Sequence, residues 1–162
     1  LVPSLEHGGR VLGQSLAIIE YLEEIQPEPA LLPAAPADRA LVRSMALGIA
    51  CDIHPLNNLR VLEYLKGPLA CDQDAVNAWY RHWIAEGFRG LETLARRHSA
   101  DGRHLFGSAV TLADVLLVPK VYNARRFRCD LAPYPTLAAI SDHLESLPAF
   151  AAARPEAQPD AE

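Results

Sequence analysis

Four prolines that stand close together divide this chain into two parts. They occupy positions 27, 29, 33 and 36. Proline lacks the amide N–H and fixes φ at about −65°, so this density excludes a helix or a central strand. We therefore interpret residues 27–37 as a linker between a short N-terminal part, residues 1–26, and a longer part, residues 38–162.

The N-terminal part is predicted to contain a small hairpin followed by a helix. Two short strands flank Gly8 and Gly9, which tolerate the positive φ of a tight turn. The residues after Ser15 then place Ile18, Tyr21 and Ile25 at helical spacing, with Ser15 as the expected N-cap. The order strand, strand, helix is the expectation for residues 1–26.

The longer part is predicted to be entirely helical. Apolar periodicity indicates a long helix over residues 38–66, interrupted near Pro55, and a second one over residues 74–97. An amphipathic helix is expected over residues 135–147, one further turn over residues 148–153, and an extended tail from residue 154. These elements predict a bundle.

One segment has the pattern of the central helix of such a bundle. Residues 111–127 carry apolar side chains on nearly every face. Thr111 and Asp114 have the spacing of a capping box, and Val110 is placed to pack against Val115 as a hydrophobic staple. We assign Asp114 to folding rather than to catalysis.

Composition narrows the range of functions. The 162 residues carry a net charge of −5 without long runs of one sign, which argues against binding to nucleic acid or to a membrane surface. Lys66 and Lys120 are the only lysines, so a pocket for an anion would be made of arginine, although genome composition explains the same bias.

The cysteines predict the cellular compartment of the protein, and the first residues predict that the chain is a fragment. Cys51, Cys71 and Cys129 are odd in number and too widely spaced for a zinc site or a disulfide framework, so free thiols in the cytoplasm are expected. Leu1 opens an apolar segment and Met45 is the only methionine, so we expect the chain to be a fragment.

Several motifs, taken together, resemble the glutathione transferases. These are the QSLAIIEYL segment at residues 14–22, the TLAD box at residues 111–114, and the order hairpin, helix, linker and helical bundle. The resemblance implies the C-terminal part of a thioredoxin-like α/β domain followed by an all-α domain. It implies that Pro3 follows a cis peptide bond and that Val2, Pro3, Gln14 and Ser15 bind the cofactor glutathione. For Pro3, an ordinary proline at the edge of a strand is the alternative.

Three further segments resemble the zeta class of this superfamily. They are CDIHPLNNLRVL at residues 51–62, NARRF at residues 123–127 and PEAQPD at residues 155–160. The resemblance implies that Arg126 and Arg60 are catalytic and that His54 and Asn58 line a pocket for an acidic substrate. The alternatives are that His54 and Asn58 merely share a helix face, and that Arg126 compensates a helix dipole.

The zeta-class resemblance implies a function. It is the glutathione-dependent cis–trans isomerisation of maleylacetoacetate to fumarylacetoacetate, a step in the breakdown of aromatic amino acids, by a cytoplasmic homodimer. Two departures from the family pattern stand beside this assignment. Leu59 stands where relatives that isomerise maleylpyruvate tend to carry arginine, which weakens the assignment of maleylpyruvate as the substrate. No segment matches the Ser-Ser-Cys motif of the zeta class.

Two alternatives remain open. The first is a maleylpyruvate isomerase or a general glutathione transferase on the same scaffold. The second, from another class, is a binding or assembly module without turnover. Gln14 and Ser15 together with Arg60 and Arg126 argue against the module, because a scaffold protein needs neither a glutathione site nor a pocket for an anion.

Overall fold

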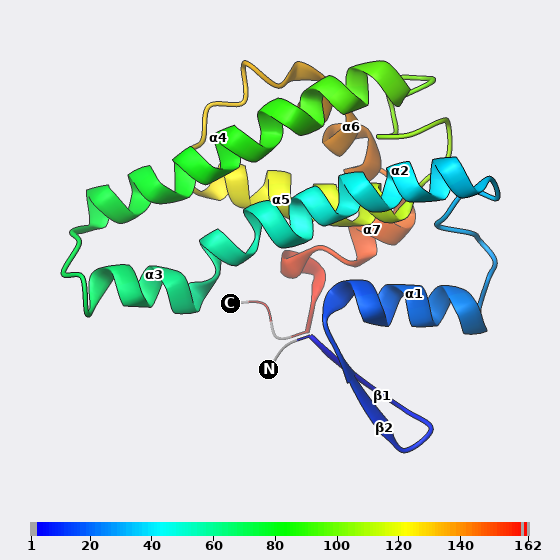
Figure 1. Ribbon diagram of the computed structural model, residues 1–162, viewed down its shortest axis with the longest axis horizontal. Helices are drawn as coiled ribbons and strands as arrows, with labels where there is room; N and C mark the ends of the chain where they lie inside the picture. Colours follow the sequence, from blue (N-terminus) through cyan, green and yellow to red (C-terminus); the bar gives the residue numbers. More distant parts are fainter. Residues whose placement is uncertain (1–2, 160, 162) are drawn as a thin grey trace.

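The N-terminal part forms the predicted hairpin and helix. The computed structural model describes residues 3–159 and 161. Strands β1 (Ser4–His7) and β2 (Arg10–Gly13) pair antiparallel, with Gly8 and Gly9 at positive φ in the turn. Helix α1 (Ser15–Ile25) follows directly (Figure 1).

The N-cap of α1 differs from the prediction. Gln14, with φ of 71° and ψ of 119°, is the N-cap, and Ser15 is the first helical residue. The positive φ of Gln14 turns the chain from β2 into α1 within a single residue, so the helix begins at Ser15, one position earlier than a cap at Ser15 would allow. The expectation that Ser15 is the N-cap was wrong.

Carboxylates of α1 tie the N-terminal part to the rest of the molecule. Glu23 accepts hydrogen bonds from the backbone N–H groups of Leu31, at 2.7 Å, and Leu32, at 2.9 Å. Glu20 pairs with Arg43 at 2.5 Å. These contacts link α1 to the linker and to the first helix after it.

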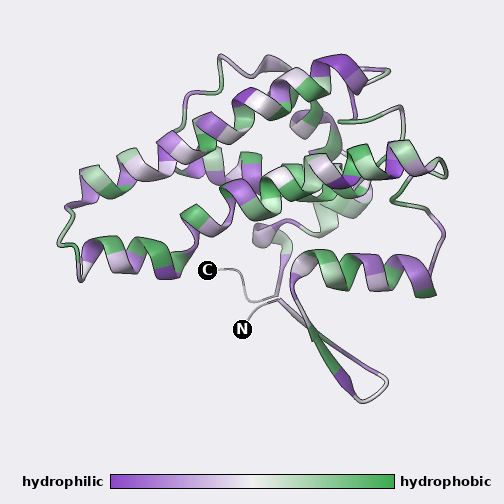
Figure 2. Ribbon diagram, viewed as in Figure 1, coloured by the Kyte–Doolittle hydropathy of each residue, from purple (hydrophilic) through white to green (hydrophobic). Residues whose placement is uncertain are grey.

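The rest of the described chain is helical. Its elements are α2 (Pro36–Leu47), the π-helical turn η1 (Gly48–Ile53), the 3₁₀ turn η2 (Pro55–Asn57), α3 (Leu59–Lys66), α4 (Gln73–His98), α5 (Leu112–Arg126), α6 (Pro135–Glu145), α7 (Pro148–Ala152) and the 3₁₀ turn η3 (Pro155–Ala157). In Figure 2 apolar and polar residues alternate along α1, α2 and α4, as expected for helices with one buried face.

The predicted break at Pro55 is present, but the helix changes earlier than expected. The α-helical pattern ends at Leu47, and η1 and η2 separate α2 from α3. Within η1, Ile53 packs so closely on α4 that a Cβ atom at Gly87 would collide with its side chain. The tail also differs from the prediction, because residues 155–157 form a 3₁₀ turn within the segment that was expected to be extended.

Helix α5 lies at the centre of the bundle, between α2 and α6 (Figure 1). Five of its apolar residues are almost completely buried: Leu112, Ala113, Leu117, Val121 and Ala124. Val115, Leu116 and Val118 are partly buried. The central position predicted for residues 111–127 is therefore confirmed. No helix among the described residues is long and apolar enough to cross a bilayer.

The predicted capping box at the start of α5 is also present. The Asp114 carboxylate is fully buried and accepts hydrogen bonds from the Thr111 backbone N–H and hydroxyl, each at 2.8 Å. It also accepts the backbone N–H of Leu105 at 2.7 Å. Burial raises the pKa of Asp114, and these hydrogen bonds oppose the shift. One side chain therefore joins the start of α5 to the preceding loop.

We expect Asp114→Asn to lower the free energy of unfolding by about 2–4 kcal/mol, because an amide cannot accept all three buried hydrogen bonds. Urea denaturation measures the loss. The control is Asp130→Asn, since Asp130 is exposed and accepts one bond, from the Ala132 N–H. Equal losses in the two variants would contradict the role given to Asp114.

Candidate functional site

Three segments of the helical part meet at one end of α5, and their contacts form the frame of the candidate site. The ring of Tyr80, on α4, stacks on Phe127 with centroids 3.6 Å apart and an interplanar angle of 6°. The Asn57 side-chain amide donates to the Tyr80 carbonyl at 3.4 Å, and the Arg81 Nε donates to the Phe127 carbonyl at 2.9 Å. The segment after α2 thus meets the end of α5 through α4 (Figure 1).

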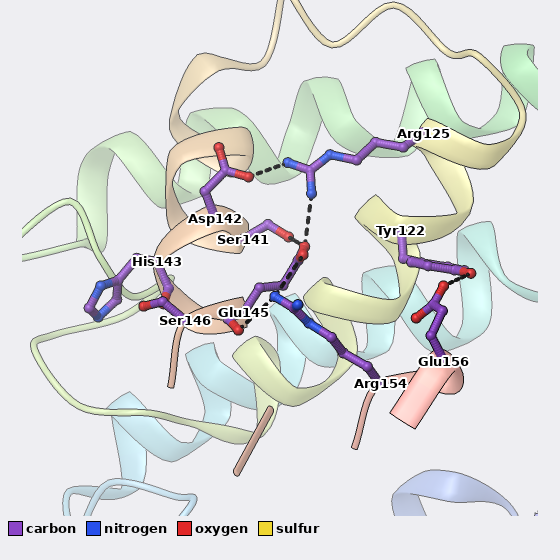
Figure 3. Close-up of polar contacts among 9 residues, drawn as sticks. All are labelled: Tyr122, Arg125, Ser141, Asp142, His143, Glu145, Ser146, Arg154 and Glu156. Atoms are coloured by element: carbon purple, nitrogen blue, oxygen red, sulfur yellow. Dashed lines mark hydrogen bonds and ion pairs between the residues drawn. The ribbon is translucent and has the colours of Figure 1, made fainter. Parts of the chain in front are cut away.

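Two adjacent arginines at the end of α5 have different surroundings. Arg125 pairs with Asp142 at 2.5 Å and with Glu145 at 2.8 Å, which fastens α5 to α6 (Figure 3). Arg126 is exposed, and no carboxylate among the described residues pairs with it. Compensation of the helix dipole applies to both residues, so it does not explain why only Arg126 is left unpaired.

The positive charge of Arg126 affects the pKa of Tyr80, whose ring stacks on Phe127. Burial raises the pKa of Tyr80 to about 12, the Cys129 thiol adds to the rise, and the positive charge of Arg126 opposes it. Arg126 is the last residue of α5 and directly precedes Phe127, whose ring stacks on Tyr80. Arg126 therefore stands at the same end of the bundle as this aromatic pair.

Arg60 occupies a position that helix stability alone disfavours. It is the second residue of α3, and its backbone N–H donates to the Asn58 Oδ1 at 3.2 Å. A cation in the first turn of a helix opposes the helix dipole. The Arg60 side chain is exposed and, among the described residues, has no carboxylate partner, which leaves it available for an anion.

His54 and Asn58 lie on either side of η2. Asn58 has extended backbone angles, φ of −69° and ψ of 147°, and its side chain caps α3. The alternative that the two residues simply share a helix face is therefore wrong. Partial burial, and then the charge of Lys120, lowers the pKa of His54.

The residues predicted to bind glutathione lie on the N-terminal part. Gln14 and Ser15 are exposed at the start of α1, and Pro3 is exposed just before β1. Val2, and with it the predicted cis peptide bond to Pro3, falls outside the described residues. Within the part of the chain that the structure describes, no hydrogen bond or ion pair joins Gln14 or Ser15 to Arg60 or Arg126.

The start of α1 fits the glutathione carboxylate that the resemblance assigns to it. The N–H groups of a first helical turn have no partners within the helix and favour negative charge. The first turn of α1 contains no acidic residue that would compete with an anion. The hydroxyl of Ser15 adds a donor at the same place.

Sequence reasoning gave Lys120 no role in the site. The side chain is only 3% exposed, and its Nζ finds no hydrogen-bond partner in the described structure. Burial lowers the pKa of Lys120 to about 8, and the Cys129 thiol opposes the shift. The available signal was a lysine within a helix that carries apolar side chains on nearly every face, in a chain with only two lysines.

Lys120 should make stability depend on pH. Between the folded pKa of about 8 and the unfolded value of 10.5, the unfolded state binds more protons, so stability rises with pH in that window. Lys120→Met removes this dependence. At pH 7 the variant is therefore expected to be about 3 kcal/mol more stable than the wild type from the loss of this charge alone.

Urea denaturation of the wild type and of Lys120→Met at pH 7 and at pH 10 checks this expectation. The control is Lys66→Met, at an exposed position in the last turn of α3. A stability difference between wild type and Lys120→Met that stays the same at both pH values would contradict it.

Family models match both parts of the chain. The model described as "Glutathione S-transferase, N-terminal domain" matches residues 1–30, and the model described as "Glutathione S-transferase, C-terminal domain" matches residues 77–152.

Two curated proteins are similar over nearly the whole chain. A probable maleylacetoacetate isomerase of Vibrio cholerae is 53% identical over 161 residues, which cover 99% of this chain and 74% of that protein. A maleylpyruvate isomerase of a Ralstonia species is 51% identical over 160 residues, which cover 99% of this chain and 76% of that protein.

Solved structures have the same fold. The holo structure of a maleylpyruvate isomerase, described as a bacterial zeta-class glutathione S-transferase, superposes with a TM-score of 0.97 at 50% identity and covers 100% of this chain and 76% of that one. A maleylacetoacetate isomerase from Anaeromyxobacter dehalogenans with glutathione in its active site superposes with a TM-score of 0.88 at 44% identity. The match covers 98% of this chain and 72% of that one.

Proposed function

The chain belongs to the glutathione S-transferase family, and from that premise we propose that it isomerises maleylacetoacetate to fumarylacetoacetate as a zeta-class enzyme. The cofactor is glutathione. The observation that carries the proposal is that Arg126, at the end of α5, and Arg60, in the first turn of α3, are both exposed and have no carboxylate partner among the described residues. Two unpaired cations suit a substrate with carboxylates.

The roles proposed for the residues follow from the charges of the reaction. When bound, glutathione supplies a thiolate that adds reversibly to the cis double bond and so permits rotation about it. Arg126 and Arg60 hold the carboxylates of the substrate and stabilise the negative charge that develops on its carbonyl oxygen. Arginine suits this role because its planar guanidinium binds a carboxylate through two parallel hydrogen bonds.

His54 and Asn58 complete the proposed pocket. The lowered pKa of His54 keeps its imidazole neutral at pH 7, so it can donate or accept a hydrogen bond without repelling the arginines. Asn58 uses its side-chain oxygen to cap α3, which leaves its amide N–H groups for a ligand. Val2, Pro3, Gln14 and Ser15 are proposed to hold glutathione.

A maleylpyruvate isomerase is the second candidate, because a protein of that name is 51% identical to this chain. The two activities are separated by comparing kcat/KM for maleylacetoacetate and for maleylpyruvate. A protein that binds glutathione but isomerises neither would instead be the binding module.

We expect Arg126→Ala to lower the glutathione-dependent isomerisation of maleylacetone about 100- to 1000-fold, because a donor aimed at developing charge is lost. The matched control is Arg125→Ala, which removes the neighbouring arginine but affects only the contacts to Asp142 and Glu145. Absorbance reports the rate, with and without glutathione.

The outcome of that comparison is decisive for the site. Similar losses in Arg125→Ala and Arg126→Ala would mean that both act through the fold, and the catalytic role of Arg126 would be rejected. Isomerisation that proceeds equally well without glutathione would reject the proposed reaction.

We also propose a homodimer with contacts through α1 and α2. Leu22 and Ile25 on α1, and Leu47 on α2, are 41%, 49% and 44% exposed, which is high for large apolar side chains. Leu47 lies one turn after Arg43, whose pair with Glu20 joins the two helices. The proposed location is the cytoplasm, and the three free cysteines suit a reducing compartment.

Sedimentation velocity tests the dimer. We expect the wild type to sediment as a dimer at micromolar concentration and Leu47→Glu to shift it towards monomer, because a charge would be buried in the interface. Val11→Glu is the control, since Val11 is 72% exposed but lies on the hairpin. A monomeric wild type would contradict the proposal.

A further inference from the structure

The PEAQPD segment of the tail, to which the proposed function gives no role, contacts the central helix through the side chain of Glu156. Residues 155–157 of this segment form η3. The Glu156 carboxylate accepts a hydrogen bond from the Tyr122 hydroxyl at 2.7 Å (Figure 3). Both side chains also line a cavity of about 1000 Å³ that α5, α7 and the linker enclose. The tail therefore meets α5 close to the end that carries Arg126.

Tyr122 and Arg126 lie on the same face of α5. They are four residues apart within one continuous helix, Leu112–Arg126. Residues at this spacing are neighbours on a helix surface, with Cβ atoms about 5–6 Å apart, and long side chains there can meet. The hydrogen bond to Glu156 raises the pKa of Tyr122, and the positive charge of Arg126 opposes the rise, in agreement with this placement. The carboxylate of Glu156 is therefore held one helical turn from Arg126.

Glu156 has a neutral partner, unlike the other two acids drawn in Figure 3. Asp142 and Glu145 pair with arginines. Glu156 accepts from a tyrosine hydroxyl instead, which lowers the pKa of its carboxyl group and keeps it ionised at pH 7. Within the part of the chain that the structure describes, neither Glu156 nor Arg126 forms an ion pair. An anion and a cation one turn apart attract each other, so the tyrosine hydrogen bond keeps them separate.

Other contacts hold the tail in place. Arg154 donates to the Glu145 carbonyl at 2.9 Å, and its guanidinium lies 3.8 Å from the carboxylate of the same residue. The Gln158 side chain donates to two carbonyls of the tail, each at 2.9 Å. None of these contacts uses the hydroxyl of Tyr122. Removal of that hydroxyl therefore frees the side chain of Glu156 while the path of the tail stays the same.

We propose that Tyr122 is a positioning residue that holds the Glu156 carboxylate away from Arg126 and so keeps Arg126 free for a carboxylate of the substrate. This inference rests on the proposed function. Without the tyrosine hydroxyl, Glu156 pairs with Arg126 and competes with the substrate from within the same chain. Such an attached competitor raises KM, but saturating substrate displaces it, so kcat is preserved.

The test measures KM and kcat for maleylacetone, with glutathione present, in the wild type and three variants. We expect Tyr122→Phe to raise KM about two- to fivefold, which is the strength of an exposed ion pair, and to leave kcat unchanged. Glu156→Gln should match the wild type, because a neutral amide does not pair with Arg126. The double variant Tyr122→Phe/Glu156→Gln should also match it. Tyr64→Phe is the control, since it removes a tyrosine hydroxyl at an exposed position on α3.

The double variant separates competition from a structural role. A KM that stays raised in the double variant would show that Tyr122 acts through the fold or contacts the substrate itself. An unchanged KM in Tyr122→Phe would show that the freed Glu156 does not reach Arg126. A fall in kcat in Tyr122→Phe would show an effect that saturating substrate does not remove. Each of these three results would overturn the proposal.

A binding measurement keeps this inference separate from the isomerase proposal. Calorimetry with maleate, a dicarboxylate with a cis double bond, reports the anion site without turnover. We expect Arg126→Ala to bind maleate about tenfold more weakly than the wild type, Tyr122→Phe about two- to fivefold more weakly, and the double variant as tightly as the wild type. Equal affinities in the wild type and Arg126→Ala would reject the anion site and, with it, the proposed function. An affinity that depends on Arg126 but is unchanged in Tyr122→Phe would reject only the role of Tyr122.

Discussion

The arrangement of the helical part depends on the buried carboxylate of Asp114. It holds the first turn of α5 to Thr111 and to the loop residue Leu105 through three hydrogen bonds. Next to it, the Leu112 N–H donates to the Leu31 carbonyl at 2.8 Å, which brings the proline-containing linker to the same turn. One helix start therefore fixes the linker, the loop and the central helix relative to one another. Buried polar networks of this kind stabilise only when every member is satisfied.

The same helix carries three cations between its middle and its end, and each has a different environment. Arg125 is paired with carboxylates of α6. Among the described residues, the buried Lys120 has no hydrogen-bond partner and the exposed Arg126 has no carboxylate partner. The pairs of Arg125 hold α5 to α6 (Figure 3), so the helix end that presents Arg126 is itself anchored. Arg125 is thus a structural residue, and the neighbouring Arg126 is left available for a ligand.

How much the sequence could predict depends on how local each signal is. The hairpin, the break at Pro55 and the capping box of α5 each follow from a few adjacent residues, and the structure confirms them. The linker over residues 27–37 stays a prediction, and α2 already begins at Pro36, before the predicted end of that linker. The π-helical turn over residues 48–53 has no such signal, because it depends on the approach of Ile53 to Gly87 on another helix. The burial of Lys120 is likewise a tertiary property that periodicity could not show.

The functional residues divide in the same way. Resemblance to the zeta class directed attention to Arg126 and Arg60, but only the structure distinguishes Arg126 from the paired Arg125 beside it. For Arg60 the position at the start of α3 adds a physical reason, since a cation there opposes the helix dipole. The roles of Arg60, Arg126, His54 and Asn58 stay predictions.

The proposed reaction also constrains parts of the molecule that lie outside the pocket. It needs a cofactor held at α1 and a substrate held at the end of α5 in a fixed relative orientation. Helix α1 is fastened through Glu20 to Arg43 and through Glu23 to the linker, and α2 packs on α5. The orientation of the two partners is therefore transmitted through these carboxylates. On this view Glu20 and Glu23 matter for the rate because they determine where Ser15 lies relative to Arg126, although neither is proposed to touch the substrate.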